Sequence, residues 1–219
     1  MKNLIHILGP GASGKSTLSR NILGDLSVVE VSTTVQALDQ HLGMTKPEKV
    51  KYTLSGNGIA LAGNLKNGSD SIKSMDALSQ VIELCWKERD TVIVDPVRCS
   101  KKFVDWMRNR PEPLAALFIY LDISLEENIR RLLARRRANV LKKGDVPTEE
   151  ALPEKTYENM LAFRDRAKGV WEHACSTYDR FPKQCLVIPE RLSAAESATA
   201  AREALEQLHN GTAEVTEGV

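Results

Sequence analysis

The feature that most constrains this chain is a glycine-rich segment close to its start. Residues 9–16 read Gly-Pro-Gly-Ala-Ser-Gly-Lys-Ser, which fits the pattern G-x-x-x-x-G-K-[ST]. The segment follows an apolar run at 3–8 and opens a helical pattern at 15–23. Glycines let a backbone wrap an anion because no Cβ blocks the amides or forbids positive φ, and the next helix offers its positive end. These features predict a phosphate-binding loop between a buried strand and a helix.

The positions of this loop have different expected roles. Lys15 is expected to reach the β- and γ-phosphates of a nucleotide, and the hydroxyl of Ser16 is expected to bind Mg²⁺, with Thr17 as the alternative. The other nucleotide-binding positions, whose backbone wraps the phosphates, are Gly9, Gly11, Ala12, Ser13 and Gly14.

Strand and helix patterns alternate along the rest of the chain. Apolar or β-branched runs predict strands at 3–8, 27–31, 91–95, 114–122 and 184–188. Strands that alternate with helices pack as a parallel sheet covered on both faces. We therefore expect an α/β fold of three layers around a five-stranded parallel sheet.

The spacing of apolar residues predicts the helices between those strands. Thr33 or Thr34 is expected to cap a helix that runs to Leu42, whereas 43–74 is expected to form short helices and loops. Residues 1–209 are expected to form one domain, with a polar, frayed tail at 210–219. The other predicted helices span 15–23, 74–89, 101–109, 126–138, 156–178 and 193–208.

Composition excludes several classes of protein. The 30 Lys and Arg residues nearly balance the 29 Asp and Glu residues, so the net charge is +1. A general polyanion binder is far more basic, and any nucleic-acid contact must use a local patch. No run approaches the roughly 20 apolar residues of a membrane span, and no signal-peptide pattern is present. These observations predict a cytoplasmic protein, with no membrane partner.

The four cysteines are scattered without CxxC spacing. This pattern does not favour a zinc site or a redox pair. We expect Cys85, Cys99, Cys175 and Cys185 to be free thiols in a reducing compartment.

Asp95 ends the apolar strand at 91–95. Ligands of parallel α/β sheets bind beyond the carboxyl ends of the strands, so Asp95 is expected to face the phosphate loop. An acid at that place either holds Mg²⁺ or accepts a proton from an attacking hydroxyl.

A basic segment without any acid extends from 129 to 144. Arg131 and Arg135 lie four residues apart and share one face of the expected helix. Such cations neutralise a phosphoryl group during its transfer, although a solvated helix surface is the simpler alternative. The basic residues are Arg130, Arg131, Arg135, Arg136, Arg137, Lys142 and Lys143.

This order of motifs resembles the P-loop nucleoside and nucleotide kinases, the adenylate-kinase-like branch of the P-loop NTPases. The resemblance implies ATP as phosphate donor and Mg²⁺ as cofactor. It implies that 33–90, a small insertion, binds the acceptor and that 129–153 forms an arginine-rich lid. It also implies catalytic roles for Lys15, Asp95, Arg131 and Arg135, with Asp95 beside Ser16 at the metal.

Polar side chains and glycines at 56–58 and 63–70 suit hydrogen bonds to a polar ring. Arg98 together with Asp95 resembles the acid–arginine arrangement of deoxynucleoside kinases. Tyr52, an aromatic residue of the acceptor region, is a candidate for stacking on a base. The candidate acceptor-binding residues are Asn64, Asn67, Ser69, Asp70 and Arg98.

The acceptor region, with the rest of the layout, resembles the bacteriophage kinases that phosphorylate 5-hydroxymethyluracil in DNA. That resemblance implies a hydroxymethyl acceptor, Asp95 or Asp70 as its base, and the host cytoplasm as location. Arg89 is the only arginine between 32 and 90, whereas adenylate-type kinases place arginines well inside this region, so a monophosphate acceptor is disfavoured. Lysines remain to supply charge or to follow a DNA backbone: Lys46, Lys49, Lys51 and Lys66.

Two alternatives stay open. One is a kinase for a free nucleoside, nucleotide or other small alcohol. The other belongs to a different class, a nucleotide-binding switch or regulatory ATPase, which would hydrolyse ATP without an acceptor. The sequence gives no oligomeric state.

Overall fold

The computed structural model describes residues 1–24, 27–39, 43–96, 100–141 and 154–210. Its centre is a mixed sheet of seven strands in the order β2-β3-β4-β5-β1-β6-β7. Strands β4, β5, β1, β6 and β7 pair in parallel, whereas β3 is antiparallel to both β2 and β4. The strands are β1 (Lys2–Leu8), β2 (Val29–Asp39), β3 (Met44–Leu54), β4 (Ile59–Leu61), β5 (Thr91–Val94), β6 (Leu114–Asp122) and β7 (Lys183–Pro189).

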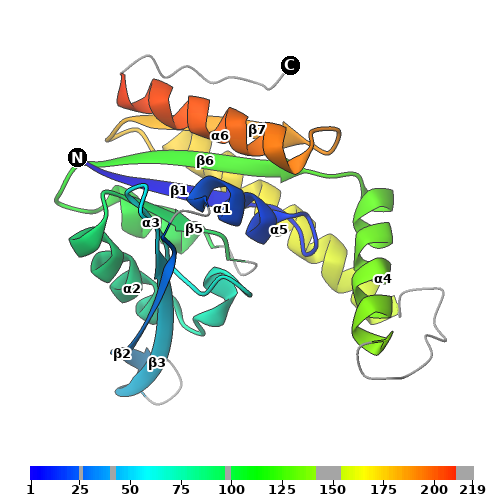
Figure 1. The fold of residues 1–219 in the computed structure, drawn as a ribbon, viewed down its shortest axis with the longest axis horizontal. Coiled ribbons are helices and arrows are strands. Elements are labelled where there is room, and N and C mark those ends of the chain that lie inside the picture. The colour runs from blue at the N-terminus through cyan, green and yellow to red at the C-terminus, as the bar shows by residue number, and fades with distance from the viewer. Residues whose placement is uncertain (25–26, 40–42, 97–99, 142–153, 211–219) are drawn as a thin grey trace.

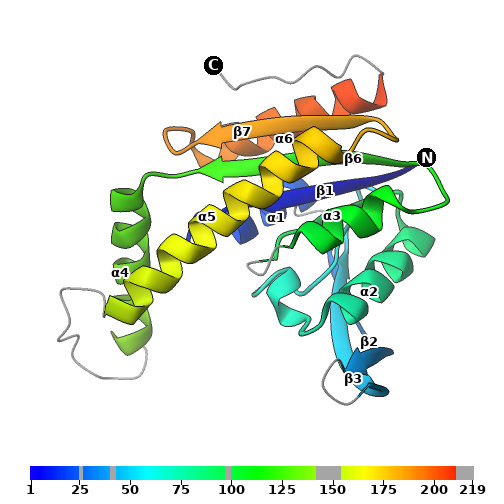
Figure 2. The ribbon, with the colours of Figure 1, turned by 180° about the vertical axis from the view of Figure 1, so that it is seen from behind.

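Helices cover the sheet on both faces and make three layers (Figures 1 and 2). On one face α1 and α6 pack on a core that includes Ile5 and Ile119. On the other face α2, α3 and α5 pack on a core that includes Leu4 and Phe118. The helices are α1 (Lys15–Leu23), α2 (Met75–Glu88), α3 (Lys101–Arg108), α4 (Leu125–Leu141), α5 (Glu154–Thr177) and α6 (Ala194–His209), with a 3₁₀ turn at η1 (Ser69–Ser71).

The central strands explain why the phosphate loop lies where it does. All residues of β1 from Asn3 onward are buried, because β1 is paired on both edges and covered on both faces. Its carboxyl end therefore points out of the middle of the sheet, where ligands of α/β folds bind. The loop at 9–14 leaves from that end and leads into α1.

The predicted five-stranded, all-parallel sheet is not confirmed. The segment expected as a helix from Thr33 to Leu42 begins as strand β2, and part of the expected loop region 43–74 is strand β3. The two pair along their full length as a long antiparallel hairpin. The reason is a two-residue alternation, in which Val50 and Tyr52 are buried while Lys49 and Lys51 are exposed. This period is the signature of a half-covered strand.

The other predicted helices are present within a few residues of their expected bounds. Ser74 caps α2 by accepting from the Ala77 amide, and α6 opens with a capping box of Ser193 and Glu196. Of the expected lid, the first part lies in α4, whereas 142–153 lies outside the described residues, as does 211–219 of the expected tail.

The expectation of four free thiols is wrong for two of them. Cys175, near the end of α5, and Cys185 of β7 form a disulfide. Sequence spacing did not indicate it, because the two meet only when α5 packs on the sheet. Cys85 is a free, buried thiol, and Cys99 lies outside the described residues.

Candidate functional site

The phosphate loop has the backbone shape that its sequence predicts. Gly14 adopts φ 104° immediately before α1, and Ala12 adopts φ 62°. A Cβ at Gly14 would approach only the guanidinium of Arg131, at 3.8 Å. Lys15 is 5% exposed, and its Nζ donates to the carbonyl oxygens of Gly9 and Pro10, each at 2.9 Å. The ammonium group thus lies inside the loop, where a bound phosphate would meet it.

Helix α4 holds this loop from the side. Asn128, in the first turn of α4, is buried and donates from Nδ2 to the carbonyl of Gly11. Arg131 donates from Nη1 to the carbonyl of Ser13 at 3.2 Å and from Nε to Glu127 at 2.7 Å. The arginine predicted for the lid therefore contacts the phosphate loop directly.

A cleft of about 500 Å³, the phosphate cleft, lies above the loop and the start of α1. Its charged groups are mostly cations, as a triphosphate requires. Both arginines predicted as catalytic, Arg131 and Arg135, line it, and Asp70 is its one carboxylate among the described residues. The other residues lining it are Ala12, Ser13, Gly14, Lys15, Ser16, Thr17, Arg20, Lys66 and Asn67.

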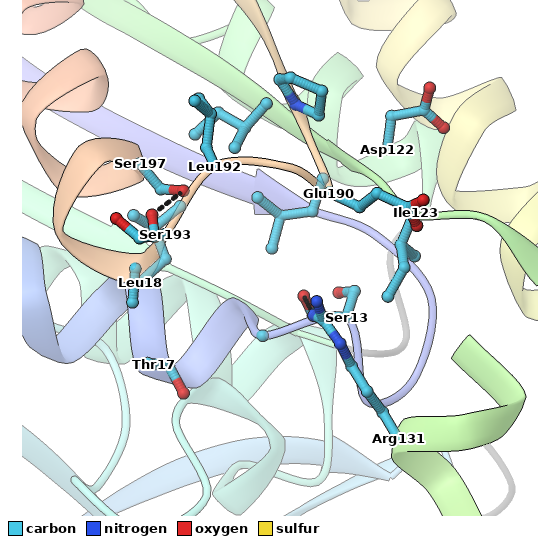
Figure 3. A pocket seen from close by; sticks show the side chains of 15 residues that line it. Ser13, Thr17, Leu18, Asp122, Ile123, Arg131, Glu190, Leu192, Ser193 and Ser197 are labelled. Carbon is cyan, nitrogen blue, oxygen red and sulfur yellow. Dashed lines mark hydrogen bonds between the residues drawn. The ribbon is translucent and has the colours of Figure 1, made fainter. Parts of the chain in front are cut away.

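A second cavity, of about 300 Å³, adjoins the phosphate cleft through Ser13, Thr17 and Arg131 (Figure 3). Apolar side chains that include Ile123 and Leu192 form its walls. Glu190 accepts from the Ser124 amide at 2.7 Å and so ties together the loops that follow β6 and β7. Hydrogen bonds from Ser124 lower the pKa of Glu190. The cavity suits a planar, largely apolar ring.

Asp95 follows β5, as predicted, but it is 1% exposed. Its Oδ1 accepts from the Ser69 amide at 2.7 Å, and its Oδ2 accepts from the Ser19 hydroxyl at 2.8 Å. The Asp95 amide donates to Ser69 Oγ at 3.1 Å. Burial raises the pKa of Asp95, although these hydrogen bonds and the charge of Lys15 act in the opposite direction. The carboxylate therefore joins the acceptor region to α1.

Gly68 covers this carboxylate. A Cβ at Gly68 would lie 2.2 Å from Asp95 Oδ1, and the residue adopts φ 56°. Gly63, with φ 147°, lies equally close to Gly68, because its Cβ would meet the Gly68 carbonyl oxygen at 2.1 Å. Both positions thus require glycine, and the segment 63–71 closes tightly over Asp95.

A third cavity has a volume of about 570 Å³, and we call it the acceptor cavity because part of its wall comes from the segment predicted to bind an acceptor. It shares Asp70 and Arg135 with the phosphate cleft. Its surface is mainly apolar on the α2 and α5 sides, with Phe163 supplied by α5. It is lined by Ser69, Asp70, Ile72, Lys73, Ser74, Met75, Leu78, Pro96, Arg135 and Phe163.

The structure does not gather every predicted acceptor residue in one place. Asn67, Ser69 and Asp70 line the phosphate cleft or the acceptor cavity, but Asn64 lines a separate groove beside the hairpin. Tyr52 is in the core that α2 covers, and it is not among the residues that line the phosphate cleft or the acceptor cavity. Arg98 lies outside the described residues.

Several residues of the site were missed from sequence. The residues that follow β6 and β7 could have been predicted as part of the site. Both strands run parallel to β1, so they end at the edge of the sheet where the phosphate loop begins. No local signal marks Asn128, Ser19 or Phe163, which reach the site only through the packing of α4, α1 and α5.

The donor set fits a nucleotide with Mg²⁺ better than a protein-held metal. The described residues contain no group of three His, Cys, Asp or Glu that could hold a metal ion. Mg²⁺ usually keeps several waters and binds through one or two side chains and the phosphates. Ser16 lines the cleft and is suited to this, whereas direct coordination by Asp95 requires Gly68 to move aside.

Comparison with known proteins agrees with this geometry. A family model described as an AAA domain, AAA_18, matches residues 5–153, more than half of the chain. The chain belongs to this family. It is a P-loop NTPase family that includes kinases, so the chain is a nucleotide-binding P-loop kinase or ATPase. No curated protein and no solved structure matches the chain.

None of the described helices has the length and apolar character needed to cross a membrane.

Proposed function

We propose that this P-loop protein is an ATP-dependent kinase that phosphorylates a hydroxyl group. The observation that carries the proposal is the continuity of two cavities: the phosphate cleft and the acceptor cavity share Asp70 and Arg135. A switch that only hydrolyses ATP needs no second cavity at the γ-phosphate. A kinase needs one there, because its acceptor must lie in line with the bond that breaks.

The donor nucleotide would lie across the first two cavities. Its base fits the apolar cavity next to Ile123 and Leu192, and its phosphates fit the loop at 9–16. Lys15 then exchanges its two carbonyl partners for phosphate oxygens, while Ser16 holds Mg²⁺. Arg131 borders both cavities, and Arg135 lies where the γ-phosphoryl group meets the acceptor, so both can offset the transferring charge.

The acceptor cavity favours an uncharged ring that bears a hydroxyl group. Phe163 and Met75 offer flat or flexible apolar contacts, and Ser69 and Ser74 offer hydrogen bonds. Of the alcohols with this shape, the hydroxymethyl group of 5-hydroxymethyluracil in DNA is our specific proposal. A free nucleoside is the alternative acceptor.

In the proposed step the acceptor oxygen attacks the γ-phosphorus and forms a new P–O bond. The bond from that phosphorus to the β–γ bridging oxygen breaks, and ADP leaves with the electron pair. The hydroxyl proton passes to a carboxylate. Asp70 supports this role because it lines both cavities, whereas Asp95 is 1% exposed and lies behind Gly68.

Transfer of the γ-phosphate from ATP to matched DNA duplexes tests the proposal, with one duplex containing thymine and the other 5-hydroxymethyluracil. Label is expected on the second duplex only. Label on a free nucleoside alone would favour the small-molecule kinase. ATP hydrolysis without any labelled acceptor would contradict the kinase and favour the regulatory ATPase.

Two carboxylate variants test the assignment within the site. Asp70→Asn should lower kcat by about 10²-fold or more, with at most a small change in the midpoint of thermal unfolding, because Asp70 is exposed. Asp95→Asn should lower the thermal midpoint as well, because it disturbs the contacts to Ser69 and Ser19. A normal kcat for Asp70→Asn would return the role of base to Asp95.

A further inference from the structure

The β2–β3 hairpin has two chemically different faces. Directly opposed residues of an antiparallel pair share a face, and the register pairs Thr33 with Val50 and Ala37 with Lys46. This first face packs on α2 through Val35, Ala37, Val50 and Tyr52. The register pairs Ser32 with Lys51 and Thr34 with Lys49 on the second face, and these four side chains are exposed.

A groove of about 480 Å³ lies between the hairpin and the segment 63–71, and we call it the hairpin groove. Four of the six hairpin residues that line it belong to the second face, and the other two are Thr33 and Val50. Every residue lining it except Val50 carries a hydroxyl, amide or ammonium group, and none carries a carboxylate. The groove is lined by Ser32, Thr33, Thr34, Lys49, Val50, Lys51, Asn64 and Ser71.

The groove lies next to the phosphate cleft and the acceptor cavity. One segment separates them: Asn64 and Ser71 face the groove, whereas Lys66 and Asp70 face the phosphate cleft. Glu30 anchors that segment to β2 by accepting from the Leu65 amide at 2.9 Å. A molecule in the acceptor cavity therefore needs to extend only past this segment to reach Lys49 and Lys51.

The positive charge of the groove is available to a ligand. Glu30 lies 3.6 Å from Lys51, and both side chains of this pair are substantially exposed. Such exposed pairs contribute only about 0–1 kcal/mol. A phosphate oxygen can therefore replace Glu30 as the partner of Lys51.

We propose that the hairpin groove binds the sugar–phosphate backbone of a nucleic-acid strand whose modified base enters the acceptor cavity. This inference rests on the DNA acceptor of the proposed function and adds the surface that would hold the polymer. Lys, Ser, Thr and Asn are typical donors to backbone phosphates and sugars. The groove has no aromatic side chain on which a base could stack, so the base is left for Phe163 in the acceptor cavity.

The spacing of the donors favours a phosphodiester chain over an acidic protein. Lys49 and Lys51 are two residues apart on one strand, and a strand rises about 3.4 Å per residue, so their Cα atoms are roughly 7 Å apart. The two ammonium groups form a short row that can bind consecutive phosphates, and the hydroxyls of Ser32 and Thr34 lie beside it on β2. Acidic side chains on a flexible peptide would not need this row.

The fold places the four lysines that were candidates for binding a DNA backbone at different sites, and one of them can serve as a matched control. Lys49 and Lys51 face the groove, and Lys66 faces the phosphate cleft. Lys46 is on the same hairpin but on its first face, opposite Ala37. A Lys46→Ala variant changes the charge of the hairpin without touching the groove.

The test measures binding of a fluorescent single-stranded oligonucleotide to full-length protein by anisotropy, from 50 to 300 mM salt. Two lost phosphate contacts should reduce the slope of log K against log salt by about 1.4, since each contact contributes about 0.7 for single strands. Lys49→Ala/Lys51→Ala should show this loss and a Kd raised by about tenfold at 50 mM salt. Lys46→Ala should bind within about twofold of the wild type.

Transfer kinetics separate this inference from the proposed function. The double variant should raise KM for a 5-hydroxymethyluracil oligonucleotide and leave KM for the free nucleoside unchanged. An unchanged salt slope in the double variant, an equal loss in Lys46→Ala, or equal competition by polyglutamate would each overturn the groove as a nucleic-acid site. Failure of the wild type to label any acceptor would instead overturn the kinase, while the binding data still decide the groove.

Discussion

The phosphate loop and the segment 63–71 both wrap backbone around a charged group, but the two charges have opposite signs. The loop at 9–14 uses positive φ at Ala12 and Gly14 to form a cradle that holds the ammonium of Lys15. The segment 63–71 uses positive φ at Gly63 and Gly68 to close over the carboxylate of Asp95. The first loop thus presents a cation to which the phosphate of a ligand can bind, whereas the segment 63–71 encloses an anion of the chain itself.

This difference teaches what each loop depends on. The phosphate loop is built from neighbours in sequence, because its strand, turn and helix are consecutive. The segment 63–71 has its shape only when β5 presents Asp95 to the Ser69 amide. Changes in the first loop should therefore affect ligand binding and transfer, and changes in the second should affect folding.

The largest expected effect is on transfer. Lys15→Ala removes the cation inside the cradle, so the transfer rate should fall by at least about 10²–10³-fold. Steady-state transfer assays with ATP and the labelled acceptor measure it. Lys66→Ala, in the same cleft but outside the loop, is the control and should have a smaller effect. A wild-type rate for Lys15→Ala would mean that the loop at 9–16 does not hold the donor.

The next effect concerns the free energy of unfolding and the segment 63–71, which closes over Asp95. Gly68→Ala places a Cβ against Asp95 in a left-handed backbone, and the free energy of unfolding should fall by roughly 3 kcal/mol. Urea denaturation measures the change. Gly58→Ala is the matched control, because Gly58 has φ 84° but no atom within 4 Å of the added Cβ, so it should lose only about 1 kcal/mol. Equal losses would refute close packing of Gly68 on Asp95.

A third prediction concerns His6, a buried histidine of β1, the strand that leads into the phosphate loop. Burial of His6 lowers its pKa from 6.5 to about 3, so the fold holds it neutral while the unfolded chain is protonated below pH 6.5. Stability should fall as the pH falls from 6.5 towards 3, by about 1.4 kcal/mol per pH unit. Between pH 7 and 5 this amounts to roughly 2 kcal/mol, which His6→Leu should abolish.

Urea denaturation at both pH values checks this, with the exposed His209→Leu as control. Asp95 should contribute with the opposite sign, because its raised pKa favours the protonated form and its contribution is lost as the pH rises above its ordinary value of 3.8. If His6→Leu keeps the full pH dependence of the wild type, the histidine is not held neutral by burial.

The smallest effect separates the two aromatic residues proposed for the acceptor. Tyr52→Phe should change KM for the acceptor by less than about twofold, since Tyr52 packs in the core. Phe163→Ala should raise that KM by about 5- to 150-fold if it stacks on the base, as stacking contributes about 1–3 kcal/mol. A larger rise in KM for Tyr52→Phe than for Phe163→Ala would mean that the acceptor contacts Tyr52 and not Phe163.

Much of the fold could be predicted from local patterns. The apolar runs that form β1 and β6 and the capped, periodic segments of α2 and α6 are where the sequence places them. The hairpin is not evident from the sequence. The alternation from Lys49 to Leu54 favours a strand, but Thr33 also has the features of a helix cap. β2 is stabilised by β3 and α2, and a single segment does not reveal partners distant in the chain.

The candidate site divides in the same way. Lys15 and Ser16 could be placed from a motif of eight consecutive residues. Phe163 and Asn128 could not, because neither belongs to a pattern of its own. The Cys175–Cys185 disulfide is a similar case, because its two halves lie on α5 and β7 and meet only through packing.

The sequence by itself determined a P-loop between a buried strand and a helix. Its glycines, its lysine and the succession of strand, loop and helix all lie within a short stretch of consecutive residues. Only the tertiary structure decided which carboxylate faces the phosphate cleft and which lysines share a groove. Gly68 shields Asp95, and the register of β2 with β3 sends Lys49 and Lys51 to one face and Lys46 to the other. Both outcomes depend on contacts between segments tens of residues apart, which local propensity does not encode.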